Sequence, residues 1–415
     1  MCAKWTKDPK DFTHYAEALL KRIWASAIVK GEQVSFSDPF NFHENQSVLV
    51  EGIEFDPTIP SSEQRGLVWK SLLAAAKSGK TKPAEFLNEL TRFEEEYKRR
   101  PPARYYLLSS VSVKWRPKLA APAVRGTSTR FYLSAPKGFD QSVVADVIRS
   151  TFHHRELPNN YTYARVGIQA RGAAEAAERS FDALELFRGS WNLFINLHYS
   201  TRLFSGRATP INTILPGPFS TLHDSSGRSV DQRIWYDPGY VEPHSPHDFR
   251  NWKEYTKHES WLFARLKRHR YRNHVEEMIR RYSSALDGTD YDVVINKLWS
   301  LLERGASAGD KYESIVRRVS FLFADVDFAR LHLEHLRRYR NRVIHAAHSS
   351  EQRNEAVHQL RRFVQAVLLF HIRNVDKAAS ISEACEFLDL PTESKVLRRR
   401  LRLIERAVRF RTSPR

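Results

Sequence analysis

The chain has 415 residues, a formal net charge of +18 and an isoelectric point near 9.9. Apolar side chains make up 41% of the sequence and aromatic ones 12%, which excludes a disordered chain and allows two or three folded domains. A protein this basic usually meets an anionic partner: nucleic acid, a membrane surface or an acidic protein. The alternative is a basic surface that only keeps the protein dissolved.

The cysteine content and the hydropathy of the sequence indicate in which cellular compartment the protein is expected. Cys2 and Cys385 form neither a paired motif nor a disulfide framework, which fits a reducing compartment. The N-terminus has no apolar signal core, and no apolar run approaches the roughly 18 residues that a membrane helix needs. We therefore expect a cytoplasmic protein without a membrane partner.

The first half of the sequence predicts a mixture of helices and strands, which we take as one mixed α/β domain over residues 1–205. Helical periodicity and strand-like alternation of apolar side chains distinguish the two kinds of element. Helices are expected at 15–28, 62–100 and 173–197, and strands at 47–55, 104–115, 130–136 and 161–172.

Residues 206–251 are rich in proline and glycine, and we expect a linker or an elaborate loop between two domains. Residues 252–415 predict an all-α bundle of amphipathic helices with short turn sequences between them. The expected helices are 252–284, 290–304, 311–323, 327–347, 352–375, 380–388 and 393–411. The predicted fold class is therefore α+β, with a mixed α/β N-terminal domain followed by an all-α helical bundle.

Familiar metal and nucleotide motifs are poorly represented. The pair His332 and His335 has the spacing of two metal ligands on a helix, but no cysteine or correctly spaced glutamate accompanies it. The run KSGKTK (77–82) ends like a phosphate-binding loop, yet Ala74 stands where the first glycine is needed. We expect neither a metal nor a cofactor.

The helix expected at 327–347 has an arginine where its apolar stripe should continue. The stripe consists of Ala329, Leu333, Leu336, Val343 and Ala347. Arg340 lies in its gap, and Asn341 and His345 share a neighbouring face, four residues apart. A guanidinium on an apolar stripe needs a carboxylate, a phosphate or a symmetric partner, because an unpaired buried charge is costly. The residues leave two interpretations open: a phosphate site, or a structural ion pair with Glu303 or Glu313.

The segment from Arg340 to His345, RNRVIH, resembles the RNxxxH motif of the HEPN superfamily. The longer segment LRRYRNRVIHAAH is similar to sequences of the Apea-like HEPN group. The motif lies late in a long expected helix, between two expected helices that are strongly apolar on one face. The resemblance covers about residues 252–375 and makes the bundle HEPN-like.

The resemblance implies a metal-independent endoribonuclease that leaves 2′,3′-cyclic phosphate and 5′-OH ends. Two protomers would pair as a homodimer with a composite active site, and the stripe carrying Arg340 would be the dimer seam. Arg340 would hold the scissile phosphate, His345 would act as general base or acid, and Asn341 would orient the histidine or the phosphate. Such proteins act in anti-phage defence or as regulated toxins, so residues 1–205 would sense a phage-derived or small-molecule trigger.

Two groups of arginines are expected to bind RNA. Arg337, Arg338 and Arg342 flank the motif. The basic helix at the C-terminus contributes Arg398, Arg399 and Arg402.

The same C-terminal helix carries an apolar stripe of Leu397, Leu401, Ile404 and Val408, through which we expect it to dock on the bundle.

Two other functions stay open from the sequence. The chain could be a non-catalytic RNA-binding or dimerisation protein that shares only the shape of the motif. It could also be a ligand-sensing adaptor in which the helices serve assembly.

Overall fold

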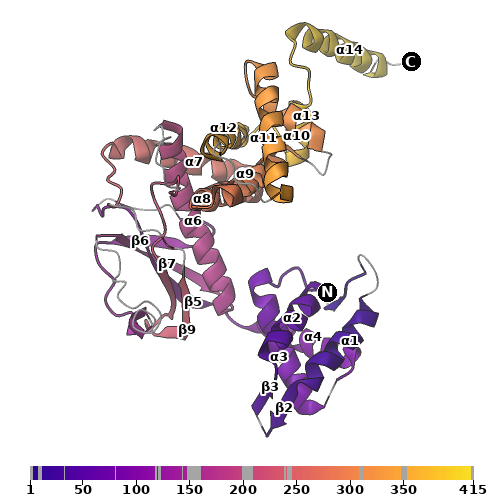
Figure 1. Cartoon of the computed structure of the whole chain (residues 1–415), viewed down its shortest axis with the longest axis vertical. Helices are drawn as coiled ribbons and strands as arrows, with labels where there is room; N and C mark the ends of the chain where they lie inside the picture. The colour runs from indigo at the N-terminus through magenta and orange to yellow at the C-terminus, as the bar shows by residue number, and fades with distance from the viewer. Residues whose placement is uncertain are drawn as a thin grey trace.

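A computed structural model describes residues 3–7, 12–31, 33–79, 81–116, 119, 123–142, 144–146, 160–198, 209–237, 240, 245–307, 312–346 and 353–412; at 39, 41, 312–313 and 343–346 it describes the backbone but not the side chain. The fold is α+β, as predicted: antiparallel sheets and helices form the N-terminal region, and helices α7–α14 form the C-terminal region (Figure 1).

Residues 4–99 form a separate group of helices and two small antiparallel sheets with their own buried core. Its elements are β1 (Lys4–Trp5), α1 (Thr13–Ala25), β2 (Ala27–Lys30), β3 (Gln33–Phe36), α2 (Pro39–Glu51), β4 (Ile53–Glu54), α3 (Ser61–Ser78) and α4 (Pro83–Arg99). The single helix expected at 62–100 is therefore two helices. Gly79, in the left-handed region at φ 67°, ends α3, and Pro83 begins α4.

The strand expected at 47–55 is wrong. Alternation of valine and leucine suggested a strand, but α2 continues to Glu51 and only Ile53–Glu54 is extended. The buried side chains of Phe42, Gln46 and Leu49 recur at helical spacing. Packing against the group's core therefore outweighs the β propensity of the valines.

The largest sheet in the described part of the chain is antiparallel and has five strands, in the order β6-β7-β5-β8-β9. The strands are β5 (Ala103–Val111), β6 (Ser128–Tyr132), β7 (Thr162–Ala170), β8 (Phe219–Asp224) and β9 (Ser229–Tyr236). The strands predicted near 104–115, 130–136 and 161–172 are confirmed. β8 and β9 lie where a linker or loop was expected, and β8 pairs with β5 through Leu107 and Leu222. The prolines and glycines of 206–251 thus surround a hairpin rather than an irregular segment.

Helix α6 (Ala173–His198), predicted almost to its ends, joins the sheet to the helical region (Figure 1). The C-terminal helices are α7 (Trp252–Arg268), α8 (Arg272–Leu286), α9 (Tyr291–Ala306), α10 (Tyr312–Ser320), α11 (Val326–Ala346), α12 (Arg353–Arg373), α13 (Ile381–Leu388) and α14 (Ser394–Thr412). The helix expected at 252–284 is interrupted, since His269 is extended between α7 and α8. Each of the other expected C-terminal helices has a counterpart among these.

The buried side chains divide near residue 100. One core contains residues 3–97, and the other runs continuously from the sheet through α6 into the C-terminal helices, from Leu107 to Ile372. The domain limits expected from composition (1–205, 206–251 and 252–415) stay a prediction, but no division of the described core coincides with them.

Glu175, at the start of α6, connects the two cores. Its backbone N–H donates to Glu63 of α3 at 2.8 Å, and its carboxylate accepts from the Tyr97 hydroxyl of α4 at 2.8 Å and from the Arg171 backbone at 2.9 Å. Burial works against the charge of Glu175, but these hydrogen bonds outweigh it and lower its pKa. The N-terminal group is thus attached to the end of the central helix.

Helix α14 does not dock on the bundle, contrary to expectation. It projects beyond α13 (Figure 1) and buries no side chain. None of the helices that the structure describes is both long and apolar enough to cross a membrane.

His371 lies at the centre of the C-terminal core, on α12. The Tyr271 hydroxyl donates to its Nδ1 at 2.9 Å, and its Nε2 donates to the Gly305 carbonyl at 2.7 Å. This pattern uses both nitrogens of a neutral imidazole. Burial lowers the pKa of His371 to about 4, compared with 6.5 for an exposed histidine.

We expect His371 to make the helical core sensitive to acid. The pKa of His371 is lower in the folded state than in the unfolded state. The stabilisation of the fold by neutral His371 is therefore fully present above pH 6.5 and is lost as the pH falls towards 4, which lowers the free energy of unfolding by about 3 kcal/mol. Urea unfolding followed by tryptophan fluorescence between pH 7.5 and 4 should show this loss. His371→Gln should flatten the dependence; an unchanged slope in the variant would contradict the assignment.

Candidate functional site on helix α11

Helix α11 begins where Asp325 accepts a hydrogen bond from the backbone N–H of Phe328 at 3.0 Å. Its inner face packs into the core through Ala329, Leu333, Leu336 and Tyr339, each at most 4% exposed. The steps between them are four, three and three residues, which is helical spacing. Tyr339 is therefore buried at the level of the gap in the stripe, beside the half-buried Arg340.

The first half of the expected dimer seam is covered by the chain's own core, through Ala329, Leu333 and Leu336. The other stripe residues, Val343 and Ala347, lie outside the described side chains, so the seam stays a prediction there. The outer face instead presents Phe328 and Leu331, 60% and 64% exposed, followed by the exposed side chains of His335, Arg338 and Arg342. A partner copy or an RNA strand would meet this outer face.

Arg340 lies at the border between the two faces and is half-buried. Its Nη1 donates to Oδ1 of the exposed neighbour Asn341 at 3.2 Å. The guanidinium and the amide of the predicted motif are therefore in contact. The alternative ion pair with Glu313 involves a side chain outside the described ones, and no described ion pair joins Arg340 to Glu303.

His345 is in the last turn of α11, one helical turn after Asn341. The structure describes its backbone but not its imidazole. The helix thus places the backbones of Arg340, Asn341 and His345 within two turns. The geometry of the imidazole relative to the guanidinium stays a prediction.

A carboxyl group of α9 lies close to this end of α11. Asp292, in the first turn of α9, is hydrogen-bonded by the Tyr339 side chain, and Arg353 at the start of α12 lies within electrostatic reach. Burial raises the pKa of Asp292, and the nearby Asp290 adds to the rise. The sequence showed Asp290 and Asp292 only as residues of a helix start, and nothing in their spacing indicated contact with a helix some 50 residues later.

The expected RNA-binding arginines fall into two groups that the structure does not bring together. On α11, Arg337 is paired with Glu334 at 2.8 Å, while Arg338 and Arg342 are exposed. The Arg342 guanidinium lies over the Tyr339 ring, 5.9 Å from its centre. Arg398, Arg399 and Arg402 are exposed on the projecting α14. Arg338 and Arg342 are therefore the cations best placed beside the motif.

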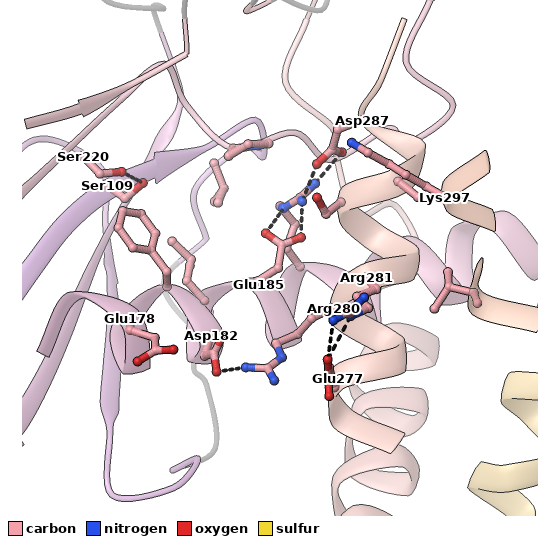
Figure 2. A pocket seen from close by; sticks show the side chains of 18 of the residues that line it. Ser109, Glu178, Asp182, Glu185, Ser220, Glu277, Arg280, Arg281, Asp287 and Lys297 are labelled. Carbon is pink, nitrogen blue, oxygen red and sulfur yellow. Dashed lines mark hydrogen bonds and ion pairs between the residues drawn. The ribbon is translucent and has the colours of Figure 1, made fainter. Parts of the chain in front are cut away.

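A second feature is a cavity of about 960 Å³ between the sheet and helices α6, α8 and α9 (Figure 2). Its charged side chains are largely paired with one another: Arg280 with Asp182, and Arg281 with Glu277. Burial lowers the pKa of Arg280 to about 10. Charge patterns on α6 and α8 were visible in the sequence, but which helices would pair was not.

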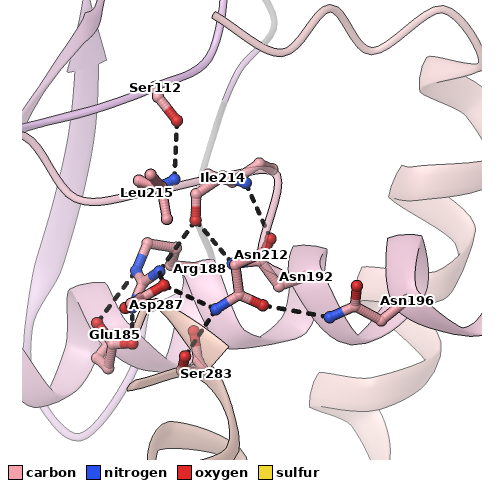
Figure 3. A network of polar contacts seen from close by, with 10 residues as sticks. All are labelled: Ser112, Glu185, Arg188, Asn192, Asn196, Asn212, Ile214, Leu215, Ser283 and Asp287. Atoms are coloured by element: carbon pink, nitrogen blue, oxygen red, sulfur yellow. Dashed lines mark hydrogen bonds and ion pairs between the residues drawn. The ribbon is translucent and has the colours of Figure 1, made fainter. Parts of the chain in front are cut away.

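One wall of this cavity is a buried network centred on Arg188 of α6, which is 1% exposed (Figure 3). Its Nη1 donates to the Ile214 carbonyl at 2.9 Å, and its Nη1 and Nη2 donate to Asp287 at 2.7 and 2.5 Å. Glu185 accepts from Nε at 3.1 Å. Burial opposes the charge on Arg188, but Asp287 and Glu185 outweigh it and raise its pKa.

Asparagines extend this network to the segment before β8. Asn212 donates to the Ser283 carbonyl at 2.6 Å and to Asp287 at 2.7 Å. Asn192 forms a reciprocal pair with the backbone of Ile214, at 2.8 and 3.0 Å. The network therefore ties α6, the end of α8 and the sheet connection together, and its role is structural.

Within the described residues, no group of three or more histidine, cysteine, aspartate or glutamate side chains is arranged to hold a metal ion. The chain matches no protein-family model, no curated protein and no solved structure. We therefore infer the function from the residues of α11 and their surroundings.

We expect Arg188→Met to lower the free energy of unfolding by about 3–5 kcal/mol, because it leaves the half-buried carboxylates of Glu185 and Asp287 without their cation. Arg281 forms an ion pair with Glu277, and more than half of the Arg281 side chain is exposed. Arg281→Met should therefore lower the free energy of unfolding by less than about 1 kcal/mol. Chemical denaturation of the purified variants measures both. Equal losses in the two variants would contradict the assigned role.

Proposed function

We propose that the chain is a metal-independent endoribonuclease of the HEPN type, acting in anti-phage defence or as a regulated toxin. The observation that carries the proposal is the contact between Arg340 and Asn341, late in α11, with His345 one turn further on. The half-buried guanidinium is anchored at the edge of the core, and the residues beside it face outward. An anionic ligand at this edge would meet the arginine and the amide, and the proposal assigns the His345 imidazole to the same ligand.

The charge of the molecule supports an RNA substrate. The chain carries a net +18, and the outer face of α11 presents Arg338 and Arg342 next to the motif. Cations in such an arrangement attract the phosphate backbone without reading its sequence. Arg337 contributes less to this surface because Glu334 already neutralises it.

The proposed reaction follows from the chemistry of these groups. A neutral His345 imidazole takes the proton of the 2′-OH, O2′ forms a bond to phosphorus, and the bond from phosphorus to O5′ breaks. An imidazolium returns a proton to O5′, which leaves a 2′,3′-cyclic phosphate and a 5′-OH. Arg340 stabilises the charge that develops on the phosphoryl oxygens, and Asn341 holds the guanidinium in place.

Pairing of two copies remains part of the proposal. Two motifs would face each other across a composite site formed by the outer faces of α11 rather than by its buried stripe. The exposed Phe328 and Leu331 on that face support such a contact. A homodimer would supply the second imidazole, so that one histidine could act as base and the other as acid.

We expect Arg340→Ala and His345→Ala each to lower the cleavage rate of total cellular RNA at least a hundredfold, because charge stabilisation and proton transfer are lost. Arg330→Ala is the matched control: it removes an exposed arginine from the same helix, three turns from the motif, and should cleave at the wild-type rate. Circular dichroism checks that all three variants are folded. Wild-type cleavage by either motif variant would show that the site is assigned wrongly.

We expect RNA affinity to depend on salt through the two arginine groups. Removing Arg338 and Arg342 together, or Arg399 and Arg402 together, should reduce the slope of log K against log salt by about 1.4 for single-stranded RNA. Filter binding in the non-cleaving His345→Ala background measures this. Replacing Arg92 and Arg228, two exposed arginines far from α11, should leave the slope unchanged; an equal reduction there would indicate that the binding is diffuse.

The 960 Å³ cavity favours one other function, a ligand-sensing adaptor. It lies between the sheet and the helices, so a ligand there would touch both parts of the molecule. Under this alternative, a phage-derived or small-molecule trigger would change the assembly of the protein without any RNA cleavage. Cleavage by the wild-type protein that disappears in His345→Ala would exclude the adaptor and also a protein that only binds RNA.

A further inference from the structure

Helix α14 is amphipathic, yet its apolar side chains face solvent. Leu401, Ile404 and Val408 are 57%, 61% and 55% exposed. The helix is 19 residues long and none of its side chains is buried. Figure 1 shows it projecting beyond α13. In proteins most of the stability of a helix comes from packing of its apolar face. No described part of this chain packs on these side chains, so we consider a partner that covers them.

The apolar residues form two stripes. The first consists of Leu397, Leu401, Ile404 and Val408, with steps of four, three and four residues, which is the spacing of a coiled-coil seam. Its residues occupy heptad positions d, a, d and a in that order. The second stripe, Val396, Leu403 and Phe410, repeats every seven residues on another side of the helix. Arg400 and Arg411 separate the stripes.

We propose that α14 pairs with α14 of a second copy of this chain as a parallel two-stranded coiled coil. In this register Arg400 is at position g and Glu405 at the following e, the two positions that meet between parallel helices. Glu393 and Arg398 occupy the previous g and e positions. Each of these two g residues therefore meets an opposite charge in the other copy, while the third g position is the uncharged Ala407. Glu393 and Glu405 are the only two acidic residues between positions 390 and 412, and both fall on this edge of the seam.

The arrangement of charge disfavours the other occupants. On a membrane surface, Arg400 would lie near the middle of the apolar half of the helix, at the deepest point of insertion. Arg411 falls at the last d position of the coiled-coil register, so it does not distinguish the two occupants. An RNA strand would bind the arginines but leave the apolar seam uncovered. In the coiled coil, Arg399 and Arg402 are at outer positions f and b, so they stay available for phosphate while the seam is buried.

The first test compares two leucines of equal exposure. Leu401→Glu places a carboxylate in the seam, whereas Leu403→Glu, 56% exposed in the single chain, places it outside the seam. Light scattering on the full chain over a range of concentrations should show association weakened at least tenfold by the first change and less than threefold by the second. Equal effects of the two variants, or a wild-type protein that is monomeric throughout, would overturn the proposal.

A second test addresses the charge pairs and the parallel direction. Arg400→Glu alone and Glu405→Arg alone each create two like-charged contacts per dimer and should weaken association roughly tenfold. A mixture of the two variants restores both attractions, so energy transfer between differently labelled copies should show preferential mixed pairs. The double variant in one chain should associate like the wild type. Random mixing would overturn the proposal.

Binding assays on the same variants test whether a lipid surface or RNA, rather than a second copy of α14, covers the seam. If Leu401→Glu abolished binding to phosphatidylserine vesicles while association was unchanged, the seam would cover a lipid surface and the proposal would fall. If RNA alone restored association of Leu401→Glu, the arginines rather than the seam would join the copies, which also overturns it. The inference does not depend on the proposed ribonuclease: loss of cleavage without loss of pairing would reject that function alone.

Discussion

The buried ion pair between Arg188 and Asp287 is the constraint on which the rest of the molecule depends. Helix α6 lies between the sheet and α8, and a fully buried guanidinium in its middle is tolerable only if every donor finds an acceptor. Asp287 at the end of α8, Glu185 on α6 and the Ile214 carbonyl provide them. This requirement sets where α8 ends relative to the sheet. α8 in turn packs against α9 and α12, and both of these helices contact α11.

The packing of these helices explains why the two faces of α11 differ. The last described residue of its inner face is Tyr339, which is buried and hydrogen-bonded to Asp292 of α9. This hydrogen bond holds α11 against α9 at the level of the motif. Arg340 follows at the border, in contact with Asn341. A rigid inner face with cations on the outer one is an arrangement suited to positioning phosphate. The proposed chemistry uses this border, and the proposed α14 pairing would bring a second copy of it nearby.

Much of the fold could be predicted from the sequence because the helices after residue 252 are amphipathic and separated by clear turn residues. Local patterns failed where packing decided the outcome. The alternation around Val48 and Val50 suggested a strand but belongs to a helix, and the proline-rich segment conceals β8 and β9, whose pairing is long-range. On α11 the sequence indicates the gap at Arg340 but not the burial of the neighbouring Tyr339, because an aromatic ring with a hydroxyl group suits either face of a helix. The docking of α14 was expected because apolar stripes are usually covered, and no sequence pattern says by which chain.

The central claim is that α11 carries a metal-independent ribonuclease site, and the chemistry of the cut ends tests it most directly. Wild-type protein would be incubated with cellular RNA in EDTA, and the new termini mapped by their susceptibility to ligation and to phosphatase. The account predicts 2′,3′-cyclic phosphate and 5′-OH ends that are absent with His345→Ala. Ends bearing 5′-phosphate, or cleavage that EDTA abolishes, would contradict it.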